Sequence, residues 1–173
     1  MQGKIEVYIS EEKIAETVKR MAEQISRDYK GKNLVCVCVL KGATLFAADL
    51  FKALTIPAEI DFVKVSSYGK GKVSSGMLNF SLDIKRENTG EYDLLFIEDI
   101  VDSGRTMKLL VGLFQDRGYR SVRSASLLDK PSRRINDYNP DYVGMTIEDR
   151  FVVGYGLDCD EKYRNLPYIG VLD

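Results

Sequence analysis

Histidine and tryptophan are absent from this chain of 173 residues, and cysteine and proline are scarce. Without histidine, a general acid or base has to be a carboxylate, a lysine, a tyrosine or a thiol. A zinc site is disfavoured, because a Cys36–Cys38 pair with one distant Cys159 offers no tetrahedral set of ligands. Cys36 and Cys38 alternate within an apolar run, which predicts small buried side chains in a strand.

The sequence also lacks a long apolar run and an excess of either charge. No stretch of about 18 apolar residues is present, and the first six residues contain no signal-peptide core, so we expect a cytoplasmic protein without a membrane span. With 25 basic and 26 acidic residues and no basic block, bulk charge gives no reason to expect a nucleic-acid or membrane partner. The length and the 45 % hydrophobic content predict one domain, residues 1–173, with a real core.

One stretch carries the strongest chemical signal. An apolar run from Leu94 to Ile97 is followed by two adjacent acids, Glu98 and Asp99, and then by the loop Asp102 to Thr106. The run predicts a strand buried on both faces, and the apolar spacing after the loop predicts a helix. The loop therefore stands between the end of a buried strand and the start of a helix.

Such a loop is suited to a phosphate monoester. The start of a helix presents free backbone N–H groups and the positive end of the helix dipole. Ser103 and Thr106 add hydroxyl donors, and Gly104 allows the backbone to approach a ligand closely. The preceding carboxylates of Glu98 and Asp99 suit ribose hydroxyls or a magnesium ion. Together these features fit a ribose 5-phosphate.

A purely structural interpretation of the same residues is also possible. Asp102 or Ser103 could cap the helix, and Glu98 and Asp99 could simply solvate the end of a strand. The complete string after a buried strand favours the ligand-binding interpretation. A P-loop is not expected, because the G-x-x-x-x-G-K-[ST] motif is absent.

Periodicity along the rest of the chain predicts an α/β fold. Apolar residues spaced by 3.6 predict a helix from Glu11 to Lys30. We expect a twisted, mainly parallel sheet with helices on both faces. Its core strands are predicted at 34–40, 57–66, 94–99 and 122–128, with shorter strands at 77–84, 142–145 and 151–156. Right-handed crossovers then bring the loops 41–44, 99–106 and 129–132 to one edge of the sheet.

Two of these loops contain lysines that could bind ligands. Lys41 and Gly42 precede a helix and form a second candidate anion site, although a simple turn is an equally good interpretation. Lys130 follows a predicted strand, at the edge where ligands bind in open α/β sheets. A surface lysine is the alternative there.

The central stretch resembles the phosphoribosyl-diphosphate signature of the type I phosphoribosyltransferases. In particular, it is similar to the form E-D-I-[IV]-D-[ST]-G-x-T of the hypoxanthine-guanine phosphoribosyltransferases. The matching residues are Glu98, Asp99, Ile100, Val101, Asp102, Ser103, Gly104 and Thr106, with Arg105 at the variable position. The resemblance extends from about Val35 to Pro167, and it implies a hood over the sheet edge, formed by the N-terminal residues and the C-terminal tail.

The resemblance also implies roles for the other candidate residues. Lys41 and Gly42 would hold the pyrophosphate of the substrate, with a cis peptide bond before Lys41. Ser67 and Tyr68 would belong to a lid that excludes water. Lys130 would donate to the 6-oxo group of a purine, and because an ammonium only donates, adenine would be disfavoured. For the C-terminal part, the resemblance implies that Phe151 stacks on the purine, Val152 reads the base edge through its backbone, Asp158 binds Mg²⁺ with Glu98 and Asp99, and Arg164 reaches the pyrophosphate.

The activity implied is purine salvage. Hypoxanthine or guanine would react with 5-phosphoribosyl 1-diphosphate and Mg²⁺ to give the nucleotide product, IMP or GMP, and pyrophosphate. Asp102 is the candidate to accept a proton from purine N7. Members of this family commonly form homo-oligomers, so a dimer or tetramer is expected. The alternatives are a xanthine-preferring phosphoribosyltransferase, an RNA-binding regulator of pyrimidine genes that keeps the phosphate cradle, and a binding module without turnover.

Overall fold

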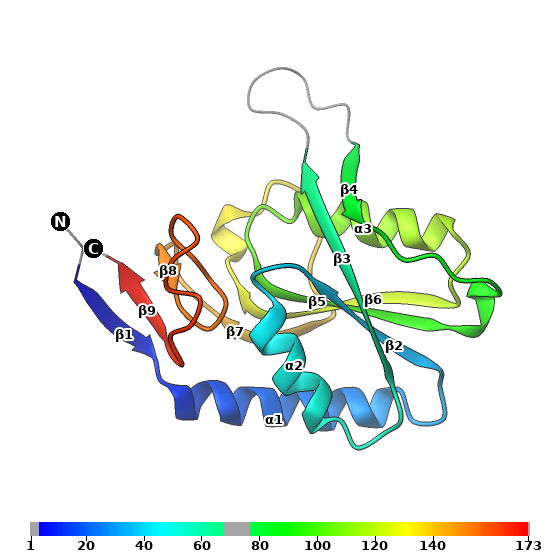
Figure 1. The fold of residues 1–173 in the computed structure, drawn as a ribbon, viewed down its shortest axis with the longest axis horizontal. Helices are drawn as coiled ribbons and strands as arrows, with labels where there is room; N and C mark the ends of the chain where they lie inside the picture. Colours follow the sequence, from blue (N-terminus) through cyan, green and yellow to red (C-terminus); the bar gives the residue numbers. More distant parts are fainter. Residues whose placement is uncertain (1–3, 68–76, 173) are drawn as a thin grey trace.

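The computed structural model describes residues 4–67 and 77–172 and contains two sheets (Figure 1). The predicted strands and helices are present, mostly within two residues of their expected ends. In chain order the elements are β1 (Ile5–Ile9), α1 (Glu11–Asp28), β2 (Leu34–Val39), α2 (Thr44–Ala53), β3 (Glu59–Ser67), β4 (Leu78–Leu82), the 3₁₀ turn η1 (Thr89–Glu91), β5 (Asp93–Val101), α3 (Arg105–Asp116), β6 (Ser121–Asp129), the 3₁₀ turn η2 (Pro131–Arg133), β7 (Tyr142–Thr146), β8 (Val152–Val153) and β9 (Ile169–Leu172).

The larger sheet has six strands in the order β4-β3-β2-β5-β6-β7. All neighbouring strands are parallel except β4, which runs antiparallel to β3 at one edge. Strand β5 is central and pairs with β2 on one side and β6 on the other. Its apolar run is fully buried, as expected for a strand that is covered on both faces. The predicted mainly parallel α/β sheet is therefore confirmed.

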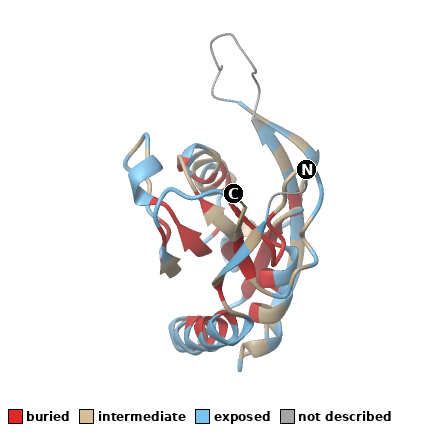
Figure 2. Cartoon of the chain, turned by 90° about the vertical axis from the view of Figure 1, so that its left-hand side faces the viewer, coloured by how far each residue is buried: buried red, intermediate tan, exposed pale blue. Residues whose placement is uncertain are grey.

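Helices cover both faces of this sheet and create two cores. Helices α1 and α2 pack on one face, where Met21, Ile25 and Phe46 are buried. Helix α3 covers the other face, where Phe114 packs edge-on against Phe96 of β5 with ring centroids 5.0 Å apart. Figure 2 shows the buried residues concentrated in the central strands and on the inner sides of the helices.

The predicted interpretation of the cysteines in β2 is confirmed. Cys36 and Cys38 are both buried in this strand, and burial raises the pKa of each thiol to about 12. At neutral pH both side chains are therefore neutral and fill space in the core. Among the described residues, no helix is long and apolar enough to cross a membrane.

A smaller antiparallel sheet joins the two ends of the chain. Strand β9 lies between β1 and β8, and Ile5 pairs with Leu172, so the first and last strands lie side by side (Figure 1). The sequence analysis predicted neither β1 nor β9. Both strands are short and only partly buried, so neither shows a clear apolar pattern. This small sheet is built from the segments for which the family resemblance implied a hood.

Two predicted boundaries are wrong. Strand β5 does not end at Asp99 but continues to Val101, because Ile100 and Val101 still pair with β6. The strand predicted at 151–156 contains only Val152 and Val153, because the chain turns immediately after them. The turn consists of Gly154, Tyr155 and Gly156, which all have positive φ angles that strands exclude.

Candidate active site

Sheet order brings three strand-to-helix loops together. Because β5 lies between β2 and β6 and all three strands are parallel, the segments that follow them meet at one edge of the sheet. The first of these segments begins with Leu40, the second with Asp102 and the third with Lys130. The expected convergence of the three loops is thus observed.

A cleft of about 350 Å³ opens at this edge. Its walls come from the ends of β2 and β5, from the start of α3, and from the C-terminal tail. The predicted site residues that line it are Gly42, Glu98, Asp99, Ile100, Asp102, Ser103, Gly104, Thr106, Asp158 and Arg164, and they are joined by Val39, Leu40, Val65, Val101 and Met107.

Two glycines allow the walls of the cleft to approach each other. A Cβ atom on Gly42 would lie 1.9 Å from Asp99 Oδ2, so only glycine fits beside the acid pair. A Cβ atom on Gly156 would lie 2.0 Å from the Gly42 carbonyl oxygen, so the tail packs directly on the loop after β2. The Leu40–Lys41 peptide bond, which opens this loop, is cis, as the resemblance implied.

Among the described residues, the acid pair at the end of β5 bonds only to its own strand. Glu98 Oε1 accepts from the Asp99 amide at 3.1 Å, and Asp99 Oδ1 accepts from the Ile100 amide at 2.7 Å. Burial, and then the charge of Asp99, raise the pKa of Glu98 well above its ordinary value. An uncompensated carboxylate pair in a cleft is an electrostatic arrangement that favours a cation or a hydroxyl-rich ligand.

The loop after β5 forms an open anion cradle. The residue that caps α3 is Gly104, with φ of 78° and no side-chain cap, so the structural alternative of Asp102 or Ser103 as the N-cap is wrong. Ser103 Oγ accepts from the Arg105 amide at 3.3 Å. Apart from the Arg105 amide, the backbone N–H groups at Gly104 and the start of α3 have no capping side chain and are available to a ligand.

Asp102 stands at the beginning of the cradle. Its Oδ1 is buried and makes no hydrogen bond to any residue that the structure describes, although Arg133 Nε lies 3.2 Å away. This oxygen is in an ion pair with Arg133, but a carboxylate oxygen has more than one acceptor site, so it can still accept a hydrogen bond from a ligand. This geometry is compatible with the expected role of Asp102 as a proton acceptor.

A cluster of charges closes the other side of the cleft. Lys41 Nζ donates to Glu161 Oε2 at 2.5 Å, and Arg164 lies 3.1 Å from Glu161 Oε1 and 3.2 Å from Asp158 Oδ1. Arg164 also donates to the Gly156 carbonyl at 2.7 Å. Two cations that the resemblance assigned to pyrophosphate thus share one carboxylate, that of Glu161. Lys41 itself is not among the residues that line the cleft.

Lys130 is not a surface lysine, so that alternative is wrong. The residue is 7 % exposed, and its Nζ donates to the Arg150 carbonyl at 2.5 Å. An ammonium has three N–H donors, so this bond leaves donors for a ligand. Next along the chain, Phe151 is 55 % exposed, which excludes a core role, whereas Val152 is buried in β8.

The remaining predicted site residues either do not line the cleft or are not among the residues that the structure describes. Ser67 is the last residue of β3, and Arg105 is exposed at the start of α3. Tyr68 and the rest of the expected lid lie outside the described residues. Among the residues that line the cleft, neither Lys130 nor Phe151 appears.

Sequence analysis missed three charged residues beside the cleft, namely Glu161, Arg133 and Arg134. Glu161 lay in a tail that showed only an acidic turn. Arg133 and Arg134 belonged to a polar loop, and the only signal was their closeness to Lys130 in sequence. Arg134 is 8 % exposed in its side chain, and such burial of an arginine is not visible in a polar segment.

The acids of the cleft fit Mg²⁺ by the chemistry of their donors. Magnesium prefers oxygen ligands and is often held by one or two carboxylates together with water and substrate phosphates. Glu98 and Asp99 provide two such carboxylates, and Asp158 lines the same cleft. Within the described residues, no three acids are close enough to hold an ion by themselves. The site therefore suits an ion that is also bound by a substrate.

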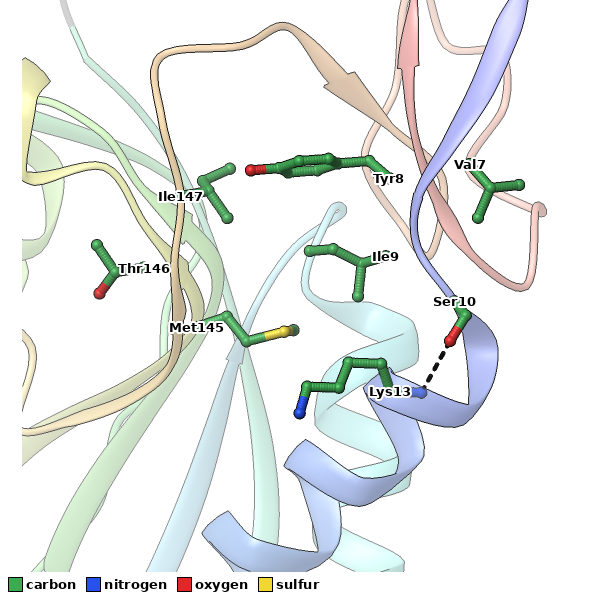
Figure 3. Close-up of a pocket in the computed structure, with 8 residues that line it drawn as sticks. All are labelled: Val7, Tyr8, Ile9, Ser10, Lys13, Met145, Thr146 and Ile147. Atoms are coloured by element: carbon green, nitrogen blue, oxygen red, sulfur yellow. Dashed lines mark hydrogen bonds between the residues drawn. The ribbon is translucent and has the colours of Figure 1, made fainter.

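A second, larger hollow lies away from these acids. Figure 3 shows Tyr8, Ile9 and Met145 pointing into it, with Ile147 beside the Tyr8 ring. Its volume is about 580 Å³, and it is lined by residues of β1, the start of α1 and the end of β7. Its lining contains no acid, and its one cation, Lys13, lies 3.7 Å from Glu16. The charged and hydroxyl-bearing lining of the smaller cleft therefore makes it the better candidate for the active site, although the second hollow is larger.

Comparison with known proteins identifies the family. Residues 7–160 match the model of the phosphoribosyl transferase domain. A hypoxanthine-guanine phosphoribosyltransferase from Streptococcus thermophilus is 48 % identical over 166 residues, which cover 96 % of this chain and 92 % of the relative.

Solved structures agree with the sequence match. A hypoxanthine phosphoribosyltransferase from Staphylococcus aureus superposes with a TM-score of 0.92 at 46 % identity, covering 97 % of this chain and 91 % of the other. A hypoxanthine-guanine phosphoribosyltransferase from Bacillus anthracis gives 0.91 at 43 % identity, with coverage of 98 % and 100 %. The family resemblance noted in the sequence is thereby confirmed, and this chain belongs to the phosphoribosyltransferase family.

Proposed function

We propose that this chain is a purine salvage enzyme that joins hypoxanthine or guanine to 5-phosphoribosyl 1-diphosphate. Purine N9 forms a bond to ribose C1, the bond from C1 to the pyrophosphate oxygen breaks, and Asp102 accepts the proton that leaves purine N7. IMP or GMP and pyrophosphate are then released. One observation carries the proposal: the acid pair of β5, the open cradle of α3 and Arg164 of the tail line a single cleft. Its close relatives carry names of the same activity.

Different residues of the cleft bind the phosphate and the ribose of the substrate. The backbone N–H groups at Gly104 and the hydroxyls of Ser103 and Thr106 hold the 5′-phosphate. Glu98 and Asp99 accept from the ribose hydroxyls, and with Asp158 they are the residues that would hold Mg²⁺. The chemistry that Mg²⁺ supplies when bound is charge neutralisation on the departing pyrophosphate.

In this proposal, two positively charged side chains bind the pyrophosphate leaving group. Lys41 and Arg164 meet at Glu161, within hydrogen-bond distance of its two oxygens. Exchange of that carboxylate for pyrophosphate keeps both cations paired while negative charge develops on the leaving oxygen. Stabilising this charge lowers the barrier because the ribosyl centre becomes cation-like in the transition state.

Recognition of the base rests on Lys130. Its free N–H donors match the 6-oxo group of hypoxanthine or guanine and repel the 6-amino group of adenine. Phe151 is exposed and available to stack on the purine. Xanthine also carries a 6-oxo group, so Lys130 does not discriminate against it. The expectation of a dimer or tetramer stays a prediction.

The first experiment compares four bases. Purified protein is supplied with 5-phosphoribosyl 1-diphosphate and Mg²⁺, and nucleotide formation is followed by absorbance with hypoxanthine, guanine, xanthine or adenine. We expect turnover with hypoxanthine or guanine and none with adenine. Turnover with adenine would contradict the role of Lys130, and no turnover with any base would contradict the proposed function. RNA retention and uracil turnover would then be measured.

Asp102→Asn tests the proton acceptor. The amide keeps the shape of the side chain but accepts a proton poorly, so we expect kcat to fall by about 10²-fold while nucleotide binding changes little. Steady-state kinetics and IMP titration measure the two effects. Asp116→Asn, a change of an exposed acid at the far end of α3, is the matched control. Full kcat in Asp102→Asn would show that another group accepts the proton.

A further inference from the structure

A second layer of chain lies behind the anion cradle. The segment 130–136 follows β6 and bonds to the end of β5 and to the loop after it. The Lys130 amide donates to the Val101 carbonyl at 3.0 Å, and the Ile135 amide donates to the Ser103 carbonyl at 3.1 Å. The lysine proposed for base recognition and the cradle proposed for the 5′-phosphate are therefore attached to the same short segment.

Arg134 makes the contacts at the centre of this layer. Its Nη1 donates to the carbonyl oxygen of Asp102 at 2.8 Å, and its Nη2 pairs with the carboxylate of Asp129. Asp129 is the residue immediately before Lys130. Both charged side chains are nearly buried, with exposed fractions of 8 % for Arg134 and 10 % for Asp129. One guanidinium thus connects the backbone at the proton acceptor with the end of the strand that carries the base-recognition lysine.

Packing as well as hydrogen bonding fixes this guanidinium. A Cβ atom on Gly104 would lie 2.8 Å from Arg134 Cδ and 2.9 Å from Asn136 Oδ1, so the arginine stem lies directly against the cradle backbone. Arginine is suited to such a position, because its planar fork donates in two fixed directions. A lysine would supply the charge but not the two divergent bonds.

We propose that Arg134 is a positioning residue that sets the spacing between the base subsite and the 5′-phosphate subsite. It touches neither substrate and acts through Asp102 and Asp129. The inference rests on the proposed function, because it assigns Lys130 to the base and residues 102–106 to the phosphate. A ligand that occupies both subsites at once has to match their spacing, whereas a ligand that occupies only the cradle does not.

Two ligands therefore distinguish positioning from simple support of the fold. IMP occupies both subsites, and ribose 5-phosphate occupies only the cradle. For Arg134→Gln we expect the affinity for IMP to fall at least tenfold and that for ribose 5-phosphate to change less than threefold. We also expect kcat/KM to fall by about 10²-fold, because small displacements of reacting groups are costly. Titration calorimetry and steady-state kinetics measure these effects.

A matched control is available at the opposite end of α3. Arg117 forms a comparable ion pair with Asp83, with two N–O distances of 2.7 Å and exposed fractions of 30 % and 21 %. Arg117→Gln should lower the melting temperature but leave both ligand affinities unchanged. If Arg134→Gln does not fold, Arg134→Lys is measured instead, since it keeps the charge beside Asp129. Asp129→Asn is a second test, because it removes the carboxylate partner next to Lys130 and keeps Arg134 itself. The same selective loss of IMP affinity is expected for this variant.

The outcomes separate this inference from the proposed function. Loss of IMP affinity with retained ribose 5-phosphate affinity supports positioning by Arg134. Unchanged affinities, or equal losses for both ligands, would overturn the positioning role of Arg134. The proposed function would still stand, provided that the wild-type protein is active. If the wild-type protein turns over no base, the proposed function itself fails.

Discussion

Strand β5 carries acids at both of its ends, and the fold treats them in opposite ways. At the start of the strand, Asp93 is 2 % exposed and accepts from Arg120 and, at 2.6 Å, from Ser121 Oγ. Burial alone would raise the pKa of this carboxyl, but the bonds from Arg120 and Ser121 outweigh burial and hold the pKa below its ordinary value. The charge of Asp93 is therefore compensated within the fold.

At the carboxyl end, Glu98 and Asp99 form no ion pair with any residue that the structure describes. Within the described ranges they accept only from backbone amides of their own strand, and the pKa of Glu98 is raised by burial and then by the charge of Asp99. An acid whose charge is compensated stabilises the structure. A pair that stays uncompensated costs stability and persists only where a ligand completes it.

Removing the carboxyl-end charges should give the largest effect. For Glu98→Gln with Asp99→Asn we expect kcat/KM to fall by about 10²-fold or more, because ribose positioning and the carboxylates for Mg²⁺ are both lost. The melting temperature should not fall, since two like charges that repel each other are removed. Steady-state kinetics and thermal melts measure the two quantities. A melting temperature that falls as far as that of an Asp93 variant would contradict the comparison.

Removing the charge at the other end should do the reverse. Asp93→Asn weakens the charge-assisted bonds from Arg120 and Ser121, and we expect it to lower the free energy of unfolding by about 2 kcal/mol. Activity per folded molecule should stay unchanged, because Asp93 lies at the edge of the sheet opposite the cleft. Urea unfolding followed by circular dichroism gives the first value, with exposed Asp116→Asn as control. A loss of activity at full folding would show that the two ends are not independent.

The pH dependence of that difference has a defined sign. The pKa of Asp93 is lowered on folding, so its stabilisation is complete above its unfolded pKa of about 3.9 and is lost as the pH falls through the folded pKa. The difference in unfolding free energy between wild type and Asp93→Asn should be constant from about pH 5 to 8 and should shrink below about pH 4. A difference that grows on acidification would exclude this explanation.

The difference between the two ends also explains what the sequence could predict. Residues 98–106 are contiguous, so the strand, the acids and the cradle were predictable from local pattern. Asp93 begins the same strand, but its partner Arg120 lies 27 positions further along the chain. The pairing of Arg134 with Asp102 is likewise non-local, with a separation of 32 positions. Local periodicity contains no information about such contacts.

The C-terminal tail was the least predictable part for a different reason. It reaches the cleft through backbone conformations rather than through an apolar pattern. Gly154, Tyr155 and Gly156 have positive φ angles, as do Glu161 and Tyr163. These turns place Asp158 and Arg164 in the cleft. Only the family resemblance pointed to both residues, and their roles toward ligands stay predictions.

Glu161 sharpens the comparison, because its charge is compensated and yet it lies beside the cleft. It bonds to Lys41 and Arg164, and these two cations lower the pKa of its carboxyl. Unlike Asp93, it is 63 % exposed, so its ion pairs are worth little. Under the proposed function, we interpret it as a weak occupant of the position that pyrophosphate would take.

Glu161→Gln should therefore give the smallest effect of the series. Removing a competing charge frees Lys41 and Arg164, and we expect pyrophosphate to inhibit about threefold more tightly, in line with the small energy of an exposed ion pair. Product-inhibition kinetics measure the constant Ki. Glu148→Gln removes an exposed ion pair with Arg150 and is the matched control. Weaker inhibition in Glu161→Gln would mean that the carboxylate orients the two cations for pyrophosphate, which would place Glu161 with Asp93 among the acids that organise the structure.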